Sequence, residues 1–481
     1  MSLERLLQLN VVYQLLEWVA YVVSWLFIFS YFATTTNVNL QVGSLKHYGR
    51  NVKLTQPTEN IKASSHAMRW GFVMITPKSL LTERRKPLDE YIEKVRTIVE
   101  KVKNEGDKAL IELTKKFDGV ELQYIKVPPE EIDAAYEEVD DEIIDALEVA
   151  KQNIERFHSI TCVERETFID FGDVVLGKRY IPFESVGIYI PGGRASYPST
   201  ALMAGVPASI AGVERTAACT PPDENGRVKP LTLVACDIAG INEVYAVGGA
   251  QAIAALAYGT ESVKPVDKIV GPGNVYVTAA KILVSKDVPI DMPAGPSEVL
   301  IIADETANAR FVALDALAQL EHDPMAIAVV LTTSEKLAKN VESIAKELGR
   351  NLNLENLKIA VVKNVEEAIE ISNRFAPEHL ELIFDGADNY LNRIKHAGSV
   401  FVGEYSPVAA GDYASGTNHI LPTAGYAKRF SGLSVETFLK HTTFQKLSKD
   451  GLRRIGQAVI KLANAEGLPL HAKSIEERLK E

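Results

Sequence analysis

Short apolar runs alternate with helix-like segments through most of the chain, and this alternation restricts the possible folds more than any other feature. From Val186 onward, each apolar run is followed by a segment with helical periodicity. The runs are VGIYI, TAACT, VYAV, KIV, VLIIA, AVVLT, KIAVV and SVFVG. Strands that alternate with helices in this way form βαβ units and largely parallel sheets. The sequence therefore predicts an α/β protein with two Rossmann-like parallel-sheet domains, one before and one after about Pro296.

The segments that flank these units are expected to be mainly helical. Residues 88–117 and 129–158 carry apolar residues at helical spacing, which predicts one long helix in each. Residues 168–190 alternate and are interrupted by glycines, as in a β-hairpin. The expected domains are an extension (1–73), a discontinuous α/β domain (74–188 and 298–433), a second α/β domain with NAD-binding loops (189–297) and a C-terminal helical segment (434–481).

The N-terminal extension differs from the rest of the chain. Residues 11–33 are apolar apart from Gln14, Glu17 and two serines, and a segment of this length can cross a bilayer as one helix. Residues 34–73 resemble a polar linker, and Met74 opens a segment typical of the start of a soluble protein. We favour Met74 as the initiator over a genuine membrane anchor. The expected location is the cytoplasm, with a membrane tether through residues 11–33 only if the extension is real.

Charge and cysteine content exclude two other classes of protein. The net charge of −11 and the lack of a basic patch argue against a nucleic-acid-binding surface. The three cysteines, Cys162, Cys219 and Cys236, are scattered and odd in number. We interpret them as small apolar residues in a reducing compartment, and not as a disulfide framework or a metal site.

Four glycine-containing loops are expected at one edge of the sheets. They are residues 191–193, 248–251, 271–274 and 295–297. Ligands of open α/β sheets bind at the carboxyl ends of the strands, and glycine lets the backbone approach them closely. None of the loops matches the dinucleotide fingerprint or the P-loop signature. Four such loops on one edge nevertheless favour a binding crevice over four unrelated tight turns.

The polar residues of these loops allow two interpretations each. Gln251 and Asn274 begin predicted helices, where each could contact an anionic or carbonyl group of a ligand or serve as an ordinary N-terminal residue. Tyr189 could stack on a ring or belong to the core. Ser297 could contact a substrate or cap the following element.

Three of the nine histidines lie in phrases that also contain a carboxylate or an amide: QLEH, PEH and GDYASGTNH. Gln319 and His322 share one face of a predicted helix, and Asp412 lies in a segment expected to be a loop. A second imidazole is needed to complete a metal site. The candidates are His419 and His471, with His441 a weaker one. Nitrogen and oxygen donors without thiolate suit Zn²⁺ or a similar divalent ion.

Glu378 and His379 form a different kind of pair. Neighbouring side chains point in different directions, so the two are not expected to bind one ion together. Two titratable groups at the start of a strand suit successive proton transfers. The alternative is an exposed pair that merely caps the strand.

Eight phrases of this sequence resemble the histidinol dehydrogenase family, over residues 76–481. They are VGIYIPGG, VGGAQAIAALAYG, KIVGPGN, DMPAGPSEVLIIAD, QLEHDP, APEHLEL, AGDYASGTNHILPT and SGLSVETFLK. The resemblance implies that L-histidinol is oxidised through L-histidinaldehyde to L-histidine with two NAD⁺ and a bound zinc ion. A rival function is a zinc-dependent hydrolase on the same fold, in which Glu378 activates water without NAD.

The resemblance also implies a role for individual residues. It makes His379 the base for the alcohol proton and Glu378 the base that activates water. The implied zinc ligands, which also surround the substrate, are Gln319, His322, Asp412 and His471. The further substrate contacts implied are Ser297, His419 and Glu466, and the NAD contacts are Tyr189, Gln251 and Asn274.

The family's quaternary structure is a further implication. Its members are homodimers of intertwined subunits, in which the C-terminal segment reaches the partner's site. Glu466 and His471 would then complete the active site of the other chain. One departure from the family pattern is Leu320, which stands where a small residue is usual, at a helix position that need not touch the metal.

Overall fold

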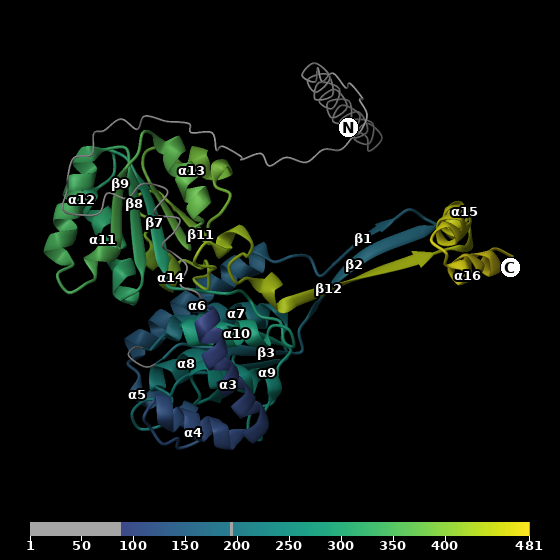
Figure 1. Cartoon of the computed structure of the whole chain (residues 1–481), viewed down its shortest axis with the longest axis horizontal. Helices are drawn as coiled ribbons and strands as arrows, with labels where there is room; N and C mark the ends of the chain where they lie inside the picture. Colours follow the sequence, from purple (N-terminus) through teal and green to yellow (C-terminus); the bar gives the residue numbers. More distant parts are fainter. Residues whose placement is uncertain (1–87, 193–195, 481) are drawn as a thin grey trace, which may run out of the picture. The chain divides into compact units, whose positions relative to one another are not determined.

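The computed structural model describes residues 88–192 and 196–480. The hydrophobic helix expected near residues 11–33, the linker after it and Met74 lie outside the described residues. Within the described part of the chain, no helix is both long enough and apolar enough to span a membrane. The described residues contain two parallel sheets flanked by helices, as the alternation predicts, and one antiparallel sheet (Figure 1).

The first parallel sheet has four strands in the order β5-β4-β3-β6. The strands are β3 (Ser185–Tyr189), β4 (Arg215–Cys219), β5 (Glu243–Tyr245) and β6 (Lys268–Val270), and the helices that connect or follow them are α7 (Pro198–Ala211), α8 (Pro230–Ile238), α9 (Gly249–Tyr258) and α10 (Val275–Val284). The chain proceeds outward from β3 to β5 and then returns to place β6 on the other side of β3. The order of strands therefore reverses between β3 and β6, and the crevice beside such a switch point is the usual ligand site of an open α/β sheet.

The second parallel sheet has five strands in the order β11-β10-β7-β8-β9. The strands are β7 (Glu298–Ala303), β8 (Ile327–Thr332), β9 (Leu357–Val361), β10 (His379–Ile383) and β11 (Ser399–Val402), and the helices are α11 (Ala309–His322), α12 (Glu335–Leu348), α13 (Val365–Phe375) and α14 (Val408–Tyr413). Short 3₁₀ helices cover Leu354–Asn356, Ala387–Arg393, Tyr426–Lys428 and Val435–Phe438. Strands β7 and β10 are direct neighbours, with His379 paired to Val299.

The two long helices expected near the start of the described chain are each divided. The four resulting helices are α3 (Asp89–Glu105), α4 (Asp107–Phe117), α5 (Pro129–Glu138) and α6 (Asp141–Thr161). Gly106 breaks the first with a φ of +58°, and the carboxylate of Glu261 accepts the N–H of Asp107 at 2.7 Å. Asp140 breaks the second, because its side chain caps α6 by accepting the N–H of Glu142 at 3.0 Å.

A three-stranded antiparallel sheet has the order β1-β2-β12. It consists of β1 (Glu166–Asp170), β2 (Val174–Pro182) and β12 (Leu439–Leu447), and the helices α15 (Lys449–Ala465) and α16 (Pro469–Lys480) follow it. The β1–β2 pair confirms the expected hairpin. The expectation that residues 434–481 are helical throughout is wrong for residues 439–447. Those residues form a strand because they pair with β2 along their whole length.

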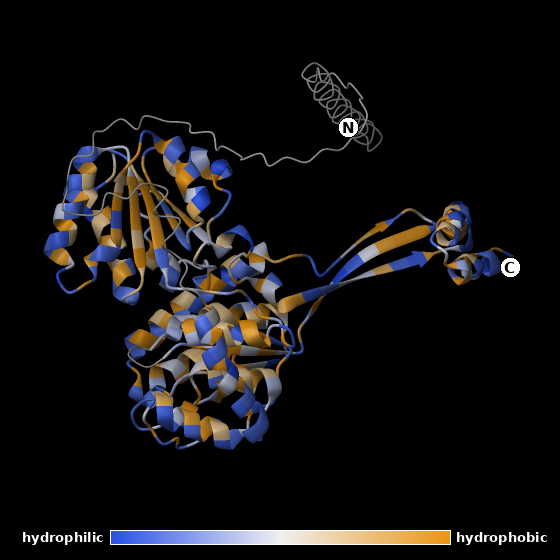
Figure 2. Ribbon diagram, in the orientation of Figure 1, coloured by the Kyte–Doolittle hydropathy of each residue, from blue (hydrophilic) through white to orange (hydrophobic). Residues whose placement is uncertain are grey.

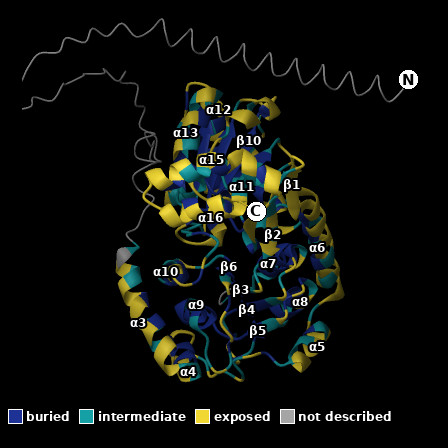
Figure 3. Cartoon of the chain, turned by 90° about the vertical axis from the view of Figure 1, so that its right-hand side faces the viewer, coloured by how far each residue is buried: buried dark blue, intermediate teal, exposed yellow. Residues whose placement is uncertain are grey.

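The buried side chains divide the helices between the two parallel sheets. The strands at the centre of the five-stranded sheet are largely apolar in Figure 2. Strands β3 and β7, each inside one of the two parallel sheets, are almost fully buried (Figure 3). Val95 and Leu110 pack in one cluster with Leu256, and Ile154 packs in another with Leu202. The two clusters of the five-stranded sheet draw their residues from 299–408. The helices over residues 89–161 thus share cores with the four-stranded sheet, whereas the expected boundaries grouped them with the five-stranded one. The domain boundaries as a whole stay a prediction.

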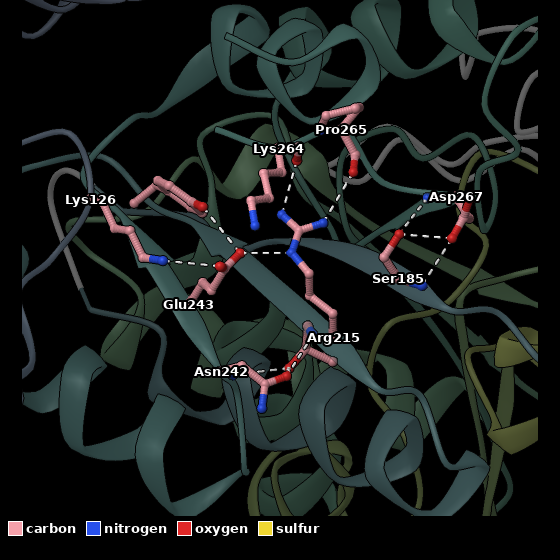
Figure 4. A network of polar contacts seen from close by, with 10 residues as sticks. Lys126, Ser185, Arg215, Asn242, Glu243, Lys264, Pro265 and Asp267 are labelled. Carbon is pink, nitrogen blue, oxygen red and sulfur yellow. Dashed lines mark hydrogen bonds and ion pairs between the residues drawn. The ribbon is translucent and has the colours of Figure 1, made fainter. Parts of the chain in front are cut away.

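A polar network joins the amino ends of the four-stranded sheet (Figure 4). Arg215 donates from Nε to the carboxylate of Glu243 at 2.9 Å and from its terminal nitrogens to two backbone carbonyl groups before β6. Lys126 donates to the same carboxylate at 2.9 Å. Ser185 donates to Asp267 at 2.8 Å, which connects β3 to the start of β6. The network connects the strands at the amino edge of the sheet. The residues named in it do not include the loops at the opposite, carboxyl edge.

Candidate active site

The site predicted from the histidine phrases is built at the amino ends of β7 and β10. Ser297 immediately precedes β7, and Glu378 immediately precedes His379, the first residue of β10. The loop of residues 295–297 was expected at the carboxyl edge with the other glycine loops, and this expectation is wrong. The chain leaves the four-stranded sheet and enters the five-stranded one through this loop, so the loop lies before a strand and not after one.

Glu378 is at the centre of a short chain of hydrogen bonds. Its Oε2 accepts the hydroxyl of Ser297 at 2.5 Å and the N–H of Glu298 at 2.8 Å. Ser297 Oγ in turn accepts from Nε2 of Gln319 at 2.8 Å. Because Nε2 of Gln319 faces Ser297, Oε1 of the same amide points away from Ser297. That oxygen is buried without a hydrogen-bond partner. A buried amide oxygen without a donor is costly unless a cation or a ligand satisfies it.

His379 is held by the backbone of the neighbouring strand. Its Nδ1 lies 3.2 Å from the carbonyl oxygen of Glu298, which can only accept, so Nδ1 carries the proton of the neutral ring. Its Nε2 is buried without a hydrogen-bond partner and lies 3.5 Å from Oδ1 of Asp412. The pair is buried, with Glu378 6% and His379 3% exposed. The interpretation of this pair as an exposed strand cap is therefore wrong.

The electrostatic environment favours proton transfer by this pair. Burial raises the pKa of Glu378, although the nearby imidazole and its hydrogen-bond donors partly oppose this. Burial alone would lower the pKa of His379. The carboxylates of Glu378 and Asp412 outweigh burial and raise the pKa of His379 to about 9 in the protein without a bound cation. Perturbed groups of this kind are typical of sites that move protons.

Asp412 lies between two imidazoles. Its Oδ2 is 3.8 Å from Nε2 of His322, and its Oδ1 faces His379. Burial alone would raise the pKa of Asp412, but contacts with the two imidazoles hold it well below its usual range. The segment from Gly411 was expected to be a loop, yet its first three residues complete helix α14. The loop begins only at Ala414, so a helix fixes the position of the Asp412 backbone.

His419 connects this site to the helix that follows β3. Its Nδ1 lies 2.8 Å from the carbonyl oxygen of Asp412, and its Nε2 lies 3.4 Å from Oγ1 of Thr200 on α7. Burial lowers the pKa of His419 more than nearby Asp412 raises it. A buried and mostly neutral imidazole at this position can orient a polar ligand.

The C-terminal candidates are not part of this group within the chain. His471 on α16, Glu466 at the end of α15 and His441 on β12 are all exposed. Among residues 88–192 and 196–480, no group of three or more His, Cys, Asp or Glu side chains could hold a metal ion. One chain thus brings together His322 and Asp412, with Gln319 beside Ser297, but leaves His471 out.

The residues expected to contact NAD lie at the carboxyl edge of the four-stranded sheet. Tyr189 ends β3, and its hydroxyl accepts the N–H of Gly249 at 3.0 Å. Gln251 is 1% exposed in the first turn of α9. Asn274 caps α10, and its Oδ1 accepts the N–H groups of Tyr276 and Val277. Tyr189 and Asn274 thus each make a structural hydrogen bond, and all three residues lie at the end of β3 or in the segments that follow β5 and β6.

Two buried carboxyl groups of the site were not predicted from the sequence. Glu298 is 2% exposed, and its Oε1 accepts the N–H groups of Glu378 at 3.3 Å and Ala424 at 3.1 Å. Glu381 is fully buried, and its Oε1 accepts the N–H of Val408, the first residue of α14, at 2.8 Å. Burial and a neighbouring acid raise the pKa of Glu381 to about 8. A signal for both was present in the sequence, because each is a carboxylate in a short, mainly apolar strand segment, and both strands are buried.

A family model described as histidinol dehydrogenase matches residues 81–479. The chain belongs to the histidinol dehydrogenase family. The histidinol dehydrogenase of Archaeoglobus fulgidus is 63% identical over 400 residues, which cover 83% of this chain and 98% of that protein. The histidinol dehydrogenase of Methanocaldococcus jannaschii is 50% identical and is covered to 96%. The crystal structure of the histidinol dehydrogenase from Elizabethkingia anophelis has a TM-score of 0.79 at 44% identity and covers 84% of this chain.

Family membership confirms the resemblance seen in the eight phrases and defines the reaction class. The chain is an oxidoreductase of histidine biosynthesis, with the activity that gives the family its name.

Proposed function

We propose that the chain oxidises L-histidinol to L-histidinaldehyde and then to L-histidine at one site, with two NAD⁺ and a bound zinc ion. The observation that carries the proposal is the arrangement around Glu378. A buried carboxylate and a buried imidazole lie 3.6 Å apart, from Oε2 of Glu378 to Nδ1 of His379. Ser297 connects the carboxylate to Gln319, whose Oε1 is buried without a hydrogen-bond partner. These are the groups that two successive proton abstractions require.

The proposed zinc ligands are Gln319, His322 and Asp412, together with His471 of the partner subunit. The unpartnered Oε1 of Gln319 and the proximity of His322 to Asp412 fit a cation with nitrogen and oxygen ligands. When bound, the ion would hold the imidazole and amine of the substrate and fix its position. The side chains of the protein then do the proton chemistry.

In the first step, His379 is the proposed base. A cation held by Asp412 would remove one of the two carboxylates that raise the pKa of His379. In the neutral ring, whose Nδ1–H is held by the carbonyl oxygen of Glu298, Nε2 would take the proton of the substrate hydroxyl. A hydride is transferred to NAD⁺ from the carbon that bears this hydroxyl. The products are the aldehyde, NADH and a proton on His379. No side chain can accept a hydride, so the cofactor supplies that part of the chemistry.

In the second step, Glu378 is the proposed base. It takes a proton from water as the water oxygen adds to the aldehyde carbon, and a second hydride then leaves for a second NAD⁺. The carboxylate is already aligned by Ser297 and by the N–H of Glu298. Its raised pKa makes it a stronger base than an exposed glutamate. A closed site also protects the reactive aldehyde between the two steps.

The remaining contacts are proposed from their places in the fold. Ser297 and His419 border the site and are proposed to contact substrate, together with Glu466 of the partner subunit. NAD is proposed to bind at the carboxyl edge of the four-stranded sheet, near Tyr189, Gln251 and Asn274. The switch point between β3 and β6 at this edge supports that placement.

We further propose that the chain is a homodimer whose sites are shared. The sheet β1-β2-β12 and the helices after it expose large apolar side chains: Phe168 (62%), Ile169 (60%), Phe171 (60%), Leu462 (64%) and Leu470 (77%). Monomeric proteins rarely leave so many exposed together. In the proposed dimer a second copy covers them, and its Glu466 and His471 reach this chain's site.

The reaction can be tested by counting NADH. We expect two NADH for each L-histidinol consumed by the purified protein, and loss of this activity after treatment with a zinc chelator, with recovery on adding zinc. The rival zinc-dependent hydrolase would produce no NADH from L-histidinol. One NADH for each substrate would contradict the second oxidation step.

The proposed location is the cytoplasm, with a tether only through residues 11–33. Chains that begin at Met1 and at Met74 can be produced in parallel and separated into membrane and soluble fractions. We expect the chain from Met74 in the soluble fraction. Its recovery with the membranes would contradict this location, and recovery of the Met1 chain alone with the membranes would establish the tether.

A further inference from the structure

A buried ion pair, separate from the proposed catalytic groups, contacts the backbone of Gly271 at the carboxyl edge of the four-stranded sheet. Lys281 on α10 and Asp291, which follows α10 in the chain, form an ion pair whose side chains are 3% and 1% exposed. Charged side chains are seldom buried this completely, and such a pair is retained at a considerable cost in desolvation. The proton transfers proposed above use neither residue.

Both members of the pair hold the backbone of Gly271. The Nζ of Lys281 donates to the carbonyl oxygen of Gly271 at 2.8 Å. The Oδ2 of Asp291 accepts the N–H of the same residue at 2.8 Å. The two polar groups of one residue are thus fixed by the two ends of one ion pair. The Oδ1 of Asp291 also accepts the N–H of Met292 at 2.6 Å.

Gly271 needs this support because of its conformation and surroundings. Its φ of +114° is accessible mainly to glycine, and a Cβ at this position would overlap the carbonyl oxygen of Tyr189. The loop after β6 is therefore pressed against the end of β3 at the switch point. The ion pair holds the residue at which this loop, up to Asn274, leaves the sheet.

We propose that the Lys281–Asp291 pair positions the loop of residues 271–274 for binding of NAD⁺. This inference rests on the proposed placement of NAD at the carboxyl edge. The pair contacts the loop backbone and not the cofactor, so both residues are positioning residues. Loss of the pair lets the loop shift, and small displacements of binding groups reduce binding of the ligand they serve.

The test removes both charges together. Removing one would leave the other buried and unpaired, which endangers folding. The variant Lys281→Met with Asp291→Asn keeps an acceptor at position 291 and contains no unpaired charge. We expect its KM for NAD⁺ to rise about tenfold or more, while its KM for L-histidinol changes less than about twofold. NAD⁺ binding measured directly by calorimetry should weaken by a similar factor.

A matched control lies at the opposite edge of the same sheet. The variant Arg215→Met with Glu243→Gln also removes an ion pair, here from the network of Figure 4. We expect this variant to lose stability without a selective rise in the KM for NAD⁺. An equal rise in both variants would overturn the proposal, because it would show a general effect of weakening the sheet.

Gly271→Ala separates failure of this proposal from failure of the NAD placement. Its Cβ distorts the loop whether or not the ion pair matters. If Gly271→Ala raises the KM for NAD⁺ and the neutral pair variant does not, the positioning role is wrong and the placement stands. If neither variant changes that KM, NAD binds elsewhere, and both proposals are overturned.

Discussion

Glu378→Gln should slow oxidation of L-histidinaldehyde by about 10²- to 10⁴-fold, the usual contribution of a general base, while L-histidinol oxidation slows by about tenfold or less. The amide of glutamine can still accept from Ser297 and from the N–H of Glu298, so the geometry of the site is preserved. It cannot take a proton from water. Feeding the aldehyde and the alcohol separately, and following NADH in a single turnover, measures the two steps independently.

The matched variant for this experiment is His379→Asn, which should produce the opposite pattern. Loss of the imidazole removes the proposed base for the alcohol proton, so alcohol oxidation should fall more than aldehyde oxidation. Equal losses in both steps for both variants would contradict the division of labour. In that case the two residues would act as one unit in each step.

A mixture of two inactive variants, His471→Ala and His379→Asn, should regain part of the enzymatic activity. A chain with His471→Ala retains its own His379, and a chain with His379→Asn retains its own His471. If each site takes His471 from the partner subunit, a mixed dimer has one complete site. Random pairing makes half of the dimers mixed, so about a quarter of wild-type activity should return. Producing both chains in one cell, or dissociating and reassociating them, permits this exchange.

The control combines His471→Ala with a chain that carries both substitutions. No pairing of these two chains contains a site with both residues, so no activity should return. Lack of activity in the first mixture, with mixed dimers demonstrated by mass spectrometry, would mean that each chain uses its own C-terminal helices. The exposed apolar residues of that region would then need another explanation.

The sequence predicted the two parallel sheets because their evidence is local. Each apolar run and the helix after it are recognisable from residues close in the chain. The helix break at Gly106 is different, since the carboxylate that caps the new helix comes from Glu261, far along the chain. Strand β12 is likewise stabilised by pairing with β2, which precedes it by more than half of the described chain. Neither partner is visible in a local pattern.

The residues of the candidate site were, like the fold, predicted where the evidence is local in the sequence. The pairs Gln319–His322 and Glu378–His379 were identified from spacing and residue type, and the structure brings both beside Ser297 and Asp412. The edge assigned to Ser297 was wrong because a loop that connects two sheets can enter the second at either end. Singling out His471 among the candidate imidazoles depended on the family resemblance, since no spacing rule connects a residue to the site of another subunit, where it is proposed to bind.

Glu298 has a consequence for how this enzyme could change during evolution. Its N–H contacts Glu378, its carbonyl oxygen contacts His379, and its carboxylate contacts the backbone of Glu378. One residue at the start of β7 thus contributes a support to each of the two proposed bases. A mutation that moves this residue disturbs the alcohol and the aldehyde oxidation together. Selection at position 298 therefore acts on the two activities together, and a descendant that keeps only one of them must arise by changes elsewhere in the site, such as at Glu378 or His379.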